Sequence, residues 1–301
     1  MTKIQITEVG PRDGLQNETE SISVSDKIQF IDLLSQSGLS FIEVGAFVSP
    51  QKVPQMAGTS DVFLGLEKNP KVTYSVLVPN EKGMEKALEV GVKKIAVFTA
   101  ASETFNQKNI NTSIQGSIDR FLPVVKMAKE NQIQVRAYIS TAFVCPYEGD
   151  ISPDHVLHVV QMLTDLGMTE ISLGDTVGRA IPDQVRVLLN ALLKKYPSEF
   201  FWMHFHDTYG KDFETGTALP NVKAALEFDI FRYDASIGGL GGCPYAPGAS
   251  GNISTNDLVN FFHEQGFETG IDLNQLNEAG LFIQKVLNRP LASPLIRSLA
   301  F

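Results

Sequence analysis

Hydrophobic positions along the chain follow two alternating patterns. Short apolar runs rich in valine, isoleucine and phenylalanine predict buried strands, and longer stretches with apolar residues three and four positions apart predict amphipathic helices. Eight strands are expected, and they are Ile4–Val9, Phe41–Phe47, Val72–Val78, Lys94–Thr99, Val135–Phe143, Glu170–Leu173, Phe201–His206 and Phe231–Ile237. The chain therefore reads as a series of strand–helix units.

Capping residues mark the ends of two of the expected helices. Ser25–Ser37 predicts a helix in which Ser25 is the N-cap and Gly38 follows the last turn. Pro153–Leu166 predicts another, with Ser152 as its N-cap and proline at the first helical position, where a missing N–H costs nothing. These signals support helices between the strands.

The order of elements predicts an α/β fold, a closed (β/α)8 or TIM barrel of parallel strands. An open doubly wound sheet is the main alternative, but it would gather polar residues at one switch point, whereas polar residues follow many strands here. No linker-like segment interrupts the series, so residues 1–301 are expected to form a single domain. Asp272–Asn288 predicts an extra helix after the eighth unit.

Composition excludes several classes of protein. The net charge of −9 leaves no basic excess for non-specific nucleic-acid binding. No apolar run reaches the roughly 20 residues that span a bilayer, and the alternating pattern of residues 3–9 is unlike a signal peptide. Two cysteines in 301 residues fit a reducing compartment. The sequence thus predicts a cytoplasmic globular protein without nucleic-acid or membrane partners.

The loop after the first expected strand carries Arg12 and Asp13 between Gly10-Pro11 and Gly14. Arginine offers a permanently charged donor fork and aspartate a hard oxygen ligand. In a parallel barrel, residues that follow the strands gather at one mouth. The loop is therefore a candidate for ligand binding, and a surface Arg–Asp ion pair is the simpler alternative.

The seventh expected strand carries His204 and His206, two of the five histidines of the chain. Side chains two positions apart on a strand leave the same face, so both imidazoles are expected to point one way. With nearby carboxylates, this spacing suits a divalent metal; a hydrogen-bonded histidine pair is the alternative. His155 and His158 lie on an expected amphipathic helix and are interpreted as ordinary surface or packing residues.

Further polar residues follow other strands. The glycine-rich segment Gly238–Asn252 matches neither a dinucleotide fingerprint nor a P-loop, and it brings the thiol of Cys243 and the amide of Asn252. Glu43 and Asp175 place carboxylates in apolar strand contexts, where burial is costly unless they are paired or metal-bound. Pairing with Arg12 is the simpler interpretation of Glu43.

Together these motifs resemble the 3-hydroxy-3-methylglutaryl-CoA lyase family of the pyruvate-carboxyltransferase-like metallolyase superfamily. Homocitrate and isopropylmalate synthases are similar in the metal pattern but lack the Gly-Gly-Cys-Pro-Tyr loop. The resemblance covers almost the whole chain and rests on residues 8–18, 47–50, 108–111, 172–176, 204–210 and 238–252.

The resemblance implies a barrel that cleaves 3-hydroxy-3-methylglutaryl-CoA to acetyl-CoA and acetoacetate, as in leucine degradation, and that forms a homodimer. It implies a Mg²⁺ or Mn²⁺ ion and assigns roles to particular residues. Asp13, His204, His206 and Asn252 would hold the metal; Arg12 would steady the enolate; Cys243 would act in proton transfer; and Glu43 and Asp175 match further carboxylates of the family. Asp13 or His204 could relay the hydroxyl proton.

The chain departs from the family pattern at three places: Gly45-Ala46 replaces the usual Thr-Ser, Asn256 replaces a glutamate, and the stretch 211–221 is longer. The natural acyl group is therefore open. A lyase for a related 3-hydroxy-3-alkylglutaryl-CoA and a non-catalytic barrel that binds acyl-CoA or metal are the alternative functions.

Overall fold

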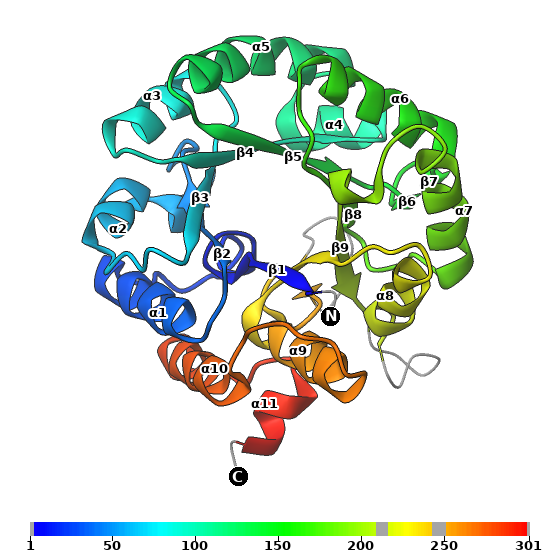
Figure 1. The fold of residues 1–301 in the computed structure, drawn as a ribbon. Helices are drawn as coiled ribbons and strands as arrows, with labels where there is room; N and C mark the ends of the chain where they lie inside the picture. The colour runs from blue at the N-terminus through cyan, green and yellow to red at the C-terminus, as the bar shows by residue number, and fades with distance from the viewer. Residues whose placement is uncertain (1–2, 209–215, 243–250, 300–301) are drawn as a thin grey trace.

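Eight parallel strands close into a barrel in the computed structural model, which describes residues 3–208, 216–242 and 251–299 (Figure 1). The barrel strands are β1 (Gln5–Glu8), β2 (Phe41–Ala46), β3 (Thr73–Leu77), β4 (Lys94–Ala100), β5 (Gln134–Ser140), β8 (Ile171–Asp175), β9 (Phe201–Asp207) and β10 (Arg232–Ala235). β10 pairs with both β9 and β1, which closes the ring. The predicted barrel is confirmed, and the open sheet is excluded.

Helices surround the strands on the outside of the barrel (Figure 1). They are α1 (Val24–Gln36), α2 (Thr59–Gly65), α3 (Glu81–Glu89), α4 (Glu103–Ile110), α5 (Ile114–Glu130), α6 (Pro153–Asp165), α7 (Pro182–Leu192), α8 (Ala218–Leu226) and α9 (Thr255–Glu264). The expected extra helix is α10 (Leu273–Leu287), and α11 (Pro294–Leu299) follows it without having been predicted. Within the described ranges, no helix is long and apolar enough to cross a membrane.

One capping prediction is wrong. Ser23, not Ser25, is the N-cap of α1: its backbone is extended and its hydroxyl accepts the Asp26 N–H at 3.0 Å. Gly38 follows α1 as predicted, with φ of +90°, and a Cβ there would lie 2.2 Å from the Gly270 carbonyl oxygen. The backbone conformation and the close neighbour both require glycine at this position.

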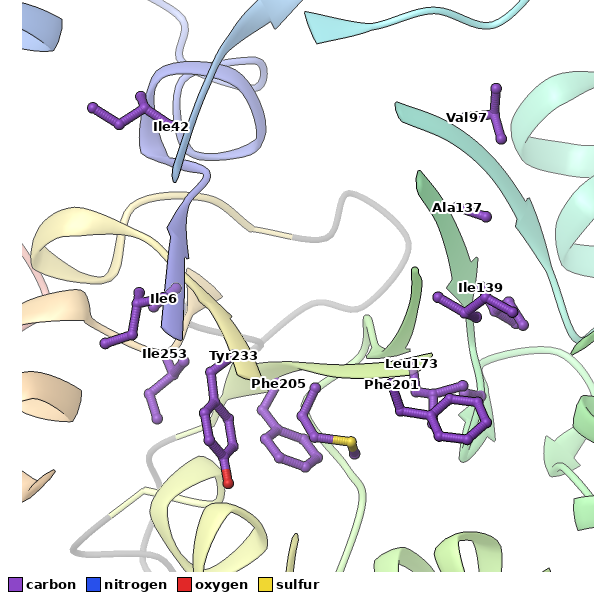
Figure 2. Packing of buried hydrophobic residues seen from close by; sticks show 14 of the residues in the cluster. Ile6, Ile42, Val97, Ala137, Ile139, Leu173, Phe201, Phe205, Tyr233 and Ile253 are labelled. Carbon is purple, nitrogen blue, oxygen red and sulfur yellow. The ribbon is translucent and has the colours of Figure 1, made fainter. Parts of the chain in front are cut away.

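Alternate residues of the barrel strands have different roles. Buried apolar side chains such as Ile6, Ala137, Ile139 and Leu173 pack in the layer between strands and helices (Figure 2). The residues between them are often polar, and Arg136 of β5 reaches across the barrel to residues of β1 and β10. Because strand side chains alternate between faces, the barrel interior is lined with polar groups that hydrogen-bond one another.

Three short strands lie outside the eight-stranded ring. β6 (Val144–Cys145) and β7 (Gly149–Asp150) form a hairpin after β5. β11 (Gly251–Asn252) pairs antiparallel with β9, so that Asn252 lies opposite His206. This last pairing was not predicted from the sequence, and it carries Asn252 to the end of the histidine-bearing strand.

Candidate active site

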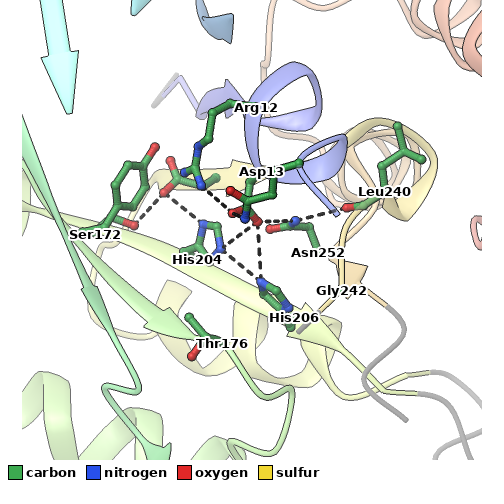
Figure 3. Close-up of polar contacts among 12 residues, drawn as sticks. Arg12, Asp13, Ser172, Thr176, His204, His206, Leu240, Gly242 and Asn252 are labelled. Carbon is green, nitrogen blue, oxygen red and sulfur yellow. Dashed lines mark hydrogen bonds and ion pairs between the residues drawn. The ribbon is translucent and has the colours of Figure 1, made fainter. Parts of the chain in front are cut away.

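His204 and His206 both point into the mouth of the barrel from β9 (Figure 3). Their Nε2 atoms are 3.2 Å apart, and each Nε2 lies 3.9 Å from Oδ2 of Asp13. The imidazoles are almost completely buried. The structure therefore brings the two histidines together with Asp13, as the spacing predicts.

Arg12 and Asp13 lie in η1 (Gly10–Gly14), a tight helical turn directly after β1. The Val9 carbonyl accepts the backbone N–H groups of Arg12, Asp13 and Gly14, which coils the turn over the end of the strand. A Cβ on Gly14 would lie 2.7 Å from the Ser236 hydroxyl, so glycine allows the turn to pack closely there. This packing places Asp13 above the two histidines.

Three potential ligand groups of Asp13, His204 and His206 lie within 4.8 Å of one another. Asn252 joins them by donating from Nδ2 to Asp13 Oδ2 at 2.8 Å and to the Leu240 carbonyl at 3.1 Å (Figure 3). Its Oδ1 is buried and has no hydrogen-bond partner among the described residues. A free buried acceptor beside a carboxylate and two imidazoles fits a metal site.

The electrostatics of this cluster favour the ligand forms of its side chains. Burial tends to raise the pKa of Asp13, but the charge of Arg12 and the two histidines more than offset it, so the pKa lies well below its usual value. Burial and the adjacent His204 lower the pKa of His206 to about 4. At neutral pH, Asp13 is therefore an anion and His206 is neutral, as metal binding requires.

Arg12 is held by two carboxylates. Its Nε donates to Glu43, and its Nη1 lies 2.5 Å from Asp13 Oδ1. The Tyr138 hydroxyl donates to the other Glu43 oxygen at 3.2 Å, and the Tyr138 ring lies 5.2 Å from the guanidinium carbon. Glu43 thus occupies the position of an ion-pair partner that orients Arg12 toward the cluster.

Asp175 ends β8 close to the cluster but is used differently. Its side-chain oxygens accept the backbone N–H groups of Arg179 and Ala180 at 3.1 and 3.0 Å. Burial raises the pKa of Asp175 to about 6, although these hydrogen bonds act to lower it. In the structure Asp175 organises the loop before α7.

His155 and His158 are exposed on α6, in agreement with their interpretation as surface residues.

Cys243, the stretch 211–221 and Asn256 are the other features that the sequence singled out. Cys243 lies outside the described residues, as do residues 211–215 of the longer stretch. Asn256 is buried in α9, where its Oδ1 accepts the Gly238 N–H at 2.9 Å and its Nδ2 donates to Asn277 at 2.8 Å. A neutral amide can both accept and donate there, which a carboxylate cannot do.

Sequence reasoning missed a buried polar network beneath the cluster. Arg136 donates to both side-chain oxygens of Asp234, and Asp234 Oδ2 lies 3.4 Å from His204 Nδ1. Burial tends to raise the pKa of Asp234, but Arg136 lowers it to about 2. The available signal was a charged residue with an apolar or aromatic neighbour on each side within an expected strand, in Val135-Arg136-Ala137 and Tyr233-Asp234-Ala235.

Glu8 has no role predicted from the sequence, yet it connects three segments below the site. It is completely buried at the end of β1. Its Oε1 accepts the N–H groups of Gly10 and Ile237 at 2.7 and 2.9 Å, and its Oε2 accepts the Thr255 hydroxyl at 2.6 Å. Burial raises its pKa to about 7. Glu8 therefore anchors the turn that carries Arg12.

Glu8→Gln is expected to change the pH dependence of stability. Between the ordinary pKa of 4.5 and about 7, folded Glu8 holds a proton that the unfolded chain has released, so the free energy of unfolding falls as pH rises. Glutamine keeps the acceptor and a donor but cannot ionise. The difference in free energy of unfolding, variant minus wild type, should increase by about 3 kcal/mol between pH 4.5 and 8, as measured by urea unfolding.

The matched control for Glu8→Gln is Glu85→Gln, which changes an exposed glutamate of α3. Its free energy of unfolding should follow that of the wild type across the same pH range. A difference between Glu8→Gln and wild type that stays constant with pH would show that the Glu8 carboxyl titrates alike in the folded and unfolded chains.

Comparisons with known proteins identify the family of the chain. The profile of the HMGL-like family matches residues 3–283. A curated Pseudomonas aeruginosa protein, "3-hydroxy-3-isohexenylglutaryl-CoA/hydroxy-methylglutaryl-CoA lyase", is 49% identical over 95% of this chain and 94% of its own length. The structure of the Bacillus subtilis HMG-CoA lyase is 43% identical, with a TM-score of 0.95 over 100% of this chain and 99% of that one.

A further solved structure carries bound molecules. The Acinetobacter baumannii HMG-CoA lyase, in complex with coenzyme A and 3-methylmalate, is 37% identical, with a TM-score of 0.92 over 99% of this chain and 97% of that one. Each match covers nearly the full length of this chain and of the protein compared with it. The matched region therefore includes the barrel strands. The resemblance inferred from the motifs is confirmed, and the chain belongs to the HMGL-like family.

Proposed function

We propose that this protein cleaves 3-hydroxy-3-methylglutaryl-CoA to acetyl-CoA and acetoacetate, and that it is a carbon–carbon lyase dependent on a divalent metal. The observation that carries the proposal is the cluster of Asp13, His204 and His206, with the guanidinium of Arg12 directly beside it. The names of the relatives and the coenzyme A bound to one neighbour support the same substrate class.

Asp13, His204, His206 and Asn252 would hold the metal. Mixed carboxylate, imidazole and amide donors without thiolate suit Mg²⁺ or Mn²⁺ better than a structural zinc. When bound, such an ion supplies Lewis-acid chemistry, which lowers the pKa of the tertiary alcohol of the substrate and orients it.

The reaction requires three events on the substrate. The tertiary hydroxyl loses its proton, and of the two candidates Asp13 would accept it, because Nε2 of His204 faces the metal site and its Nδ1 faces Asp234. The bond between the carbinol carbon and the thioester methylene then breaks, leaving a ketone in acetoacetate and the electron pair in the enolate of acetyl-CoA. A proton finally returns to the enolate carbon, and Cys243 is the proposed acid for this step.

Arg12 would stabilise the enolate oxygen as its charge develops. The neighbouring carboxylates keep the pKa of Arg12 above its usual value despite burial, so the guanidinium stays charged throughout the reaction. Glu43 accepts its Nε–H and the Tyr138 ring lies beside the guanidinium, which fixes its orientation before the substrate arrives. Such preorganised donors contribute most to catalysis where charge appears only in the transition state.

A second candidate substrate class is a 3-hydroxyglutaryl-CoA with a larger 3-alkyl group. The β2 end carries Gly45 and Ala46 instead of hydroxyl residues, and Ala46 packs in a separate apolar cluster with Met56, Leu77, Ala96 and Tyr138. Tyr138 also contacts Glu43, so this cluster lies next to the Arg12 side of the site. The name of the Pseudomonas aeruginosa relative, which includes a 3-isohexenyl substrate, supports this class.

The test is a panel of 3-hydroxy-3-alkylglutaryl-CoA thioesters, incubated with purified protein, Mg²⁺ or Mn²⁺ and dithiothreitol. We expect release of acetyl-CoA, followed by chromatography, and its loss on adding EDTA. The substrate with the highest kcat/KM distinguishes the methyl from the longer alkyl class. If the protein binds these thioesters tightly but releases no product from any of them, the lyase proposal is wrong and the non-catalytic acyl-CoA-binding barrel takes its place.

Three finer expectations stay predictions: the choice between Mg²⁺ and Mn²⁺, assembly as a homodimer, and a cytoplasmic location. The organisation of residues 1–301 as one catalytic domain also stays a prediction. Metal analysis of the purified protein and light scattering would test the metal and the dimer.

A further inference from the structure

Asp234 is a buried carboxylate that the proposed reaction does not use. It lies on β10 directly opposite His204 of β9 in the register of the two strands. Its Oδ2 is 3.4 Å from Nδ1 of His204, the ring nitrogen that faces away from Asp13 and His206. Asp234 and His204 are 1% and 5% exposed, so bulk water does not compete for this contact.

Groups from two further strands hold the Asp234 carboxylate. Arg136 Nη2 of β5 donates to its two oxygens at 2.9 and 3.1 Å, and the Ser172 hydroxyl of β8 donates to Oδ2 at 2.6 Å. Nη1 of the same arginine donates to Thr7 of β1 at 3.0 Å. The guanidinium also lies 4.8 Å from the Trp202 ring. The carboxylate is thus fixed before any ligand binds.

An ionised carboxylate only accepts hydrogen bonds, so it favours the His204 tautomer with its proton on Nδ1. The lone pair of Nε2 is then directed at Asp13 and His206, where the proposed metal would bind. Within the described residues, neither Nδ1 makes a hydrogen bond that meets the usual geometry. The two imidazoles differ because Nδ1 of His204 faces a carboxylate oxygen at 3.4 Å.

We propose that Asp234, held by Arg136 and Ser172, is a positioning residue that sets the tautomer and orientation of His204 for metal binding. The proposal rests on the metal site of the proposed function. Removing the partner of a metal-binding histidine commonly costs 10- to 100-fold in metal affinity.

Asparagine is an informative replacement at this position. All three neighbours of Asp234, namely Arg136, Ser172 and His204, are arranged to donate. Asparagine has nearly the same shape, but it replaces one acceptor oxygen with a donating NH₂ group and removes the charge. Asp234→Asn therefore weakens the support of His204 with little change in volume.

The experiment titrates metal-free protein with Mn²⁺ and measures free Mn²⁺ by electron paramagnetic resonance. We expect the dissociation constant of Asp234→Asn to rise about 10- to 100-fold over wild type. The matched control is Asp257→Asn in α9, a half-buried carboxylate that accepts the Leu295 N–H. Its Mn²⁺ affinity should stay within about twofold of wild type, because a loss of stability alone does not alter the ligands of folded protein.

Asp234→Asn leaves the buried charge of Arg136 without its partner, which can prevent folding. The second variant therefore combines Asp234→Leu with Arg136→Met, so that neither charge is left unpaired. We expect the same loss of Mn²⁺ affinity in this double variant. ¹⁵N histidine spectra of metal-free wild type should show a proton on Nδ1 of His204, and the double variant should lose this tautomer preference.

Two results would overturn the inference, and they have different meanings. Wild-type Mn²⁺ affinity in the folded double variant would show that Asp234 does not position His204, while leaving the metal site intact. Failure of the wild type itself to bind Mn²⁺ would remove the metal site of the proposed function and the inference with it.

Discussion

Arg12→Gln is expected to lower kcat at least ~100-fold while the protein keeps its metal. Losing one charged donor to a developing oxyanion typically costs about 3 kcal/mol, or two to three powers of ten in rate. The metal should remain because Gln16 and Asn252 still hold Asp13, at 3.0 and 2.8 Å. Removing the positive charge of Arg12 beside the site also makes binding of the metal cation more favourable. Steady-state kinetics and metal analysis on one sample measure both quantities.

The matched control for Arg12→Gln is Arg186→Gln. Arg186 is partly exposed and pairs with Glu227 and Asp183 on the outside of the barrel, so its loss should leave kcat unchanged. A thermal melt of each variant separates catalytic loss from unfolding, since Arg12→Gln leaves the buried Glu43 with the Tyr138 hydroxyl as its one side-chain partner among the described residues. Near-normal turnover of folded Arg12→Gln would contradict the role assigned to Arg12.

His206→Ala is expected to remove metal and activity together. Alanine removes one of the four proposed ligands, and the three that are left, Asp13, His204 and Asn252, are too few donors to retain an ion through desalting. Activity should fall at least ~100-fold. Mn²⁺ should raise the melting temperature of the wild type but not that of the variant, because only a ligand bound to the folded state stabilises it.

Two exposed histidines on α6 provide the control for this variant. His155→Ala and His158→Ala remove the same side chain from a surface helix, so metal content and kcat should match the wild type. Full metal occupancy in an inactive His206→Ala protein would contradict the ligand assignment and point to another role for this imidazole.

The closed barrel is predictable because its signal is local and repeated. Hydrophobic runs such as those around Val76 and Ile95 indicate that each strand is buried. The helical periodicity between the runs indicates a helix that connects one parallel strand to the next. The end of a strand is less certain: Val135–Phe143 is predicted as strand, but β5 stops at Ser140, before Thr141 adopts φ of +52°. Similarly, Ser25 and Ser23 are both good N-caps by type, and only the backbone of Ser23 is extended.

The sequence alone determined which chemistry is available at the mouth of the barrel. Arg12 and Asp13 follow a strand directly, and His204 and His206 share a face through the two-residue period, so local geometry suffices. Two contributions depended on tertiary structure: β11 delivers Asn252 opposite His206, and Asp234 reaches His204 from the adjacent strand. Contacts between distant segments depend on strand register and closure of the ring, which no local pattern of residues encodes.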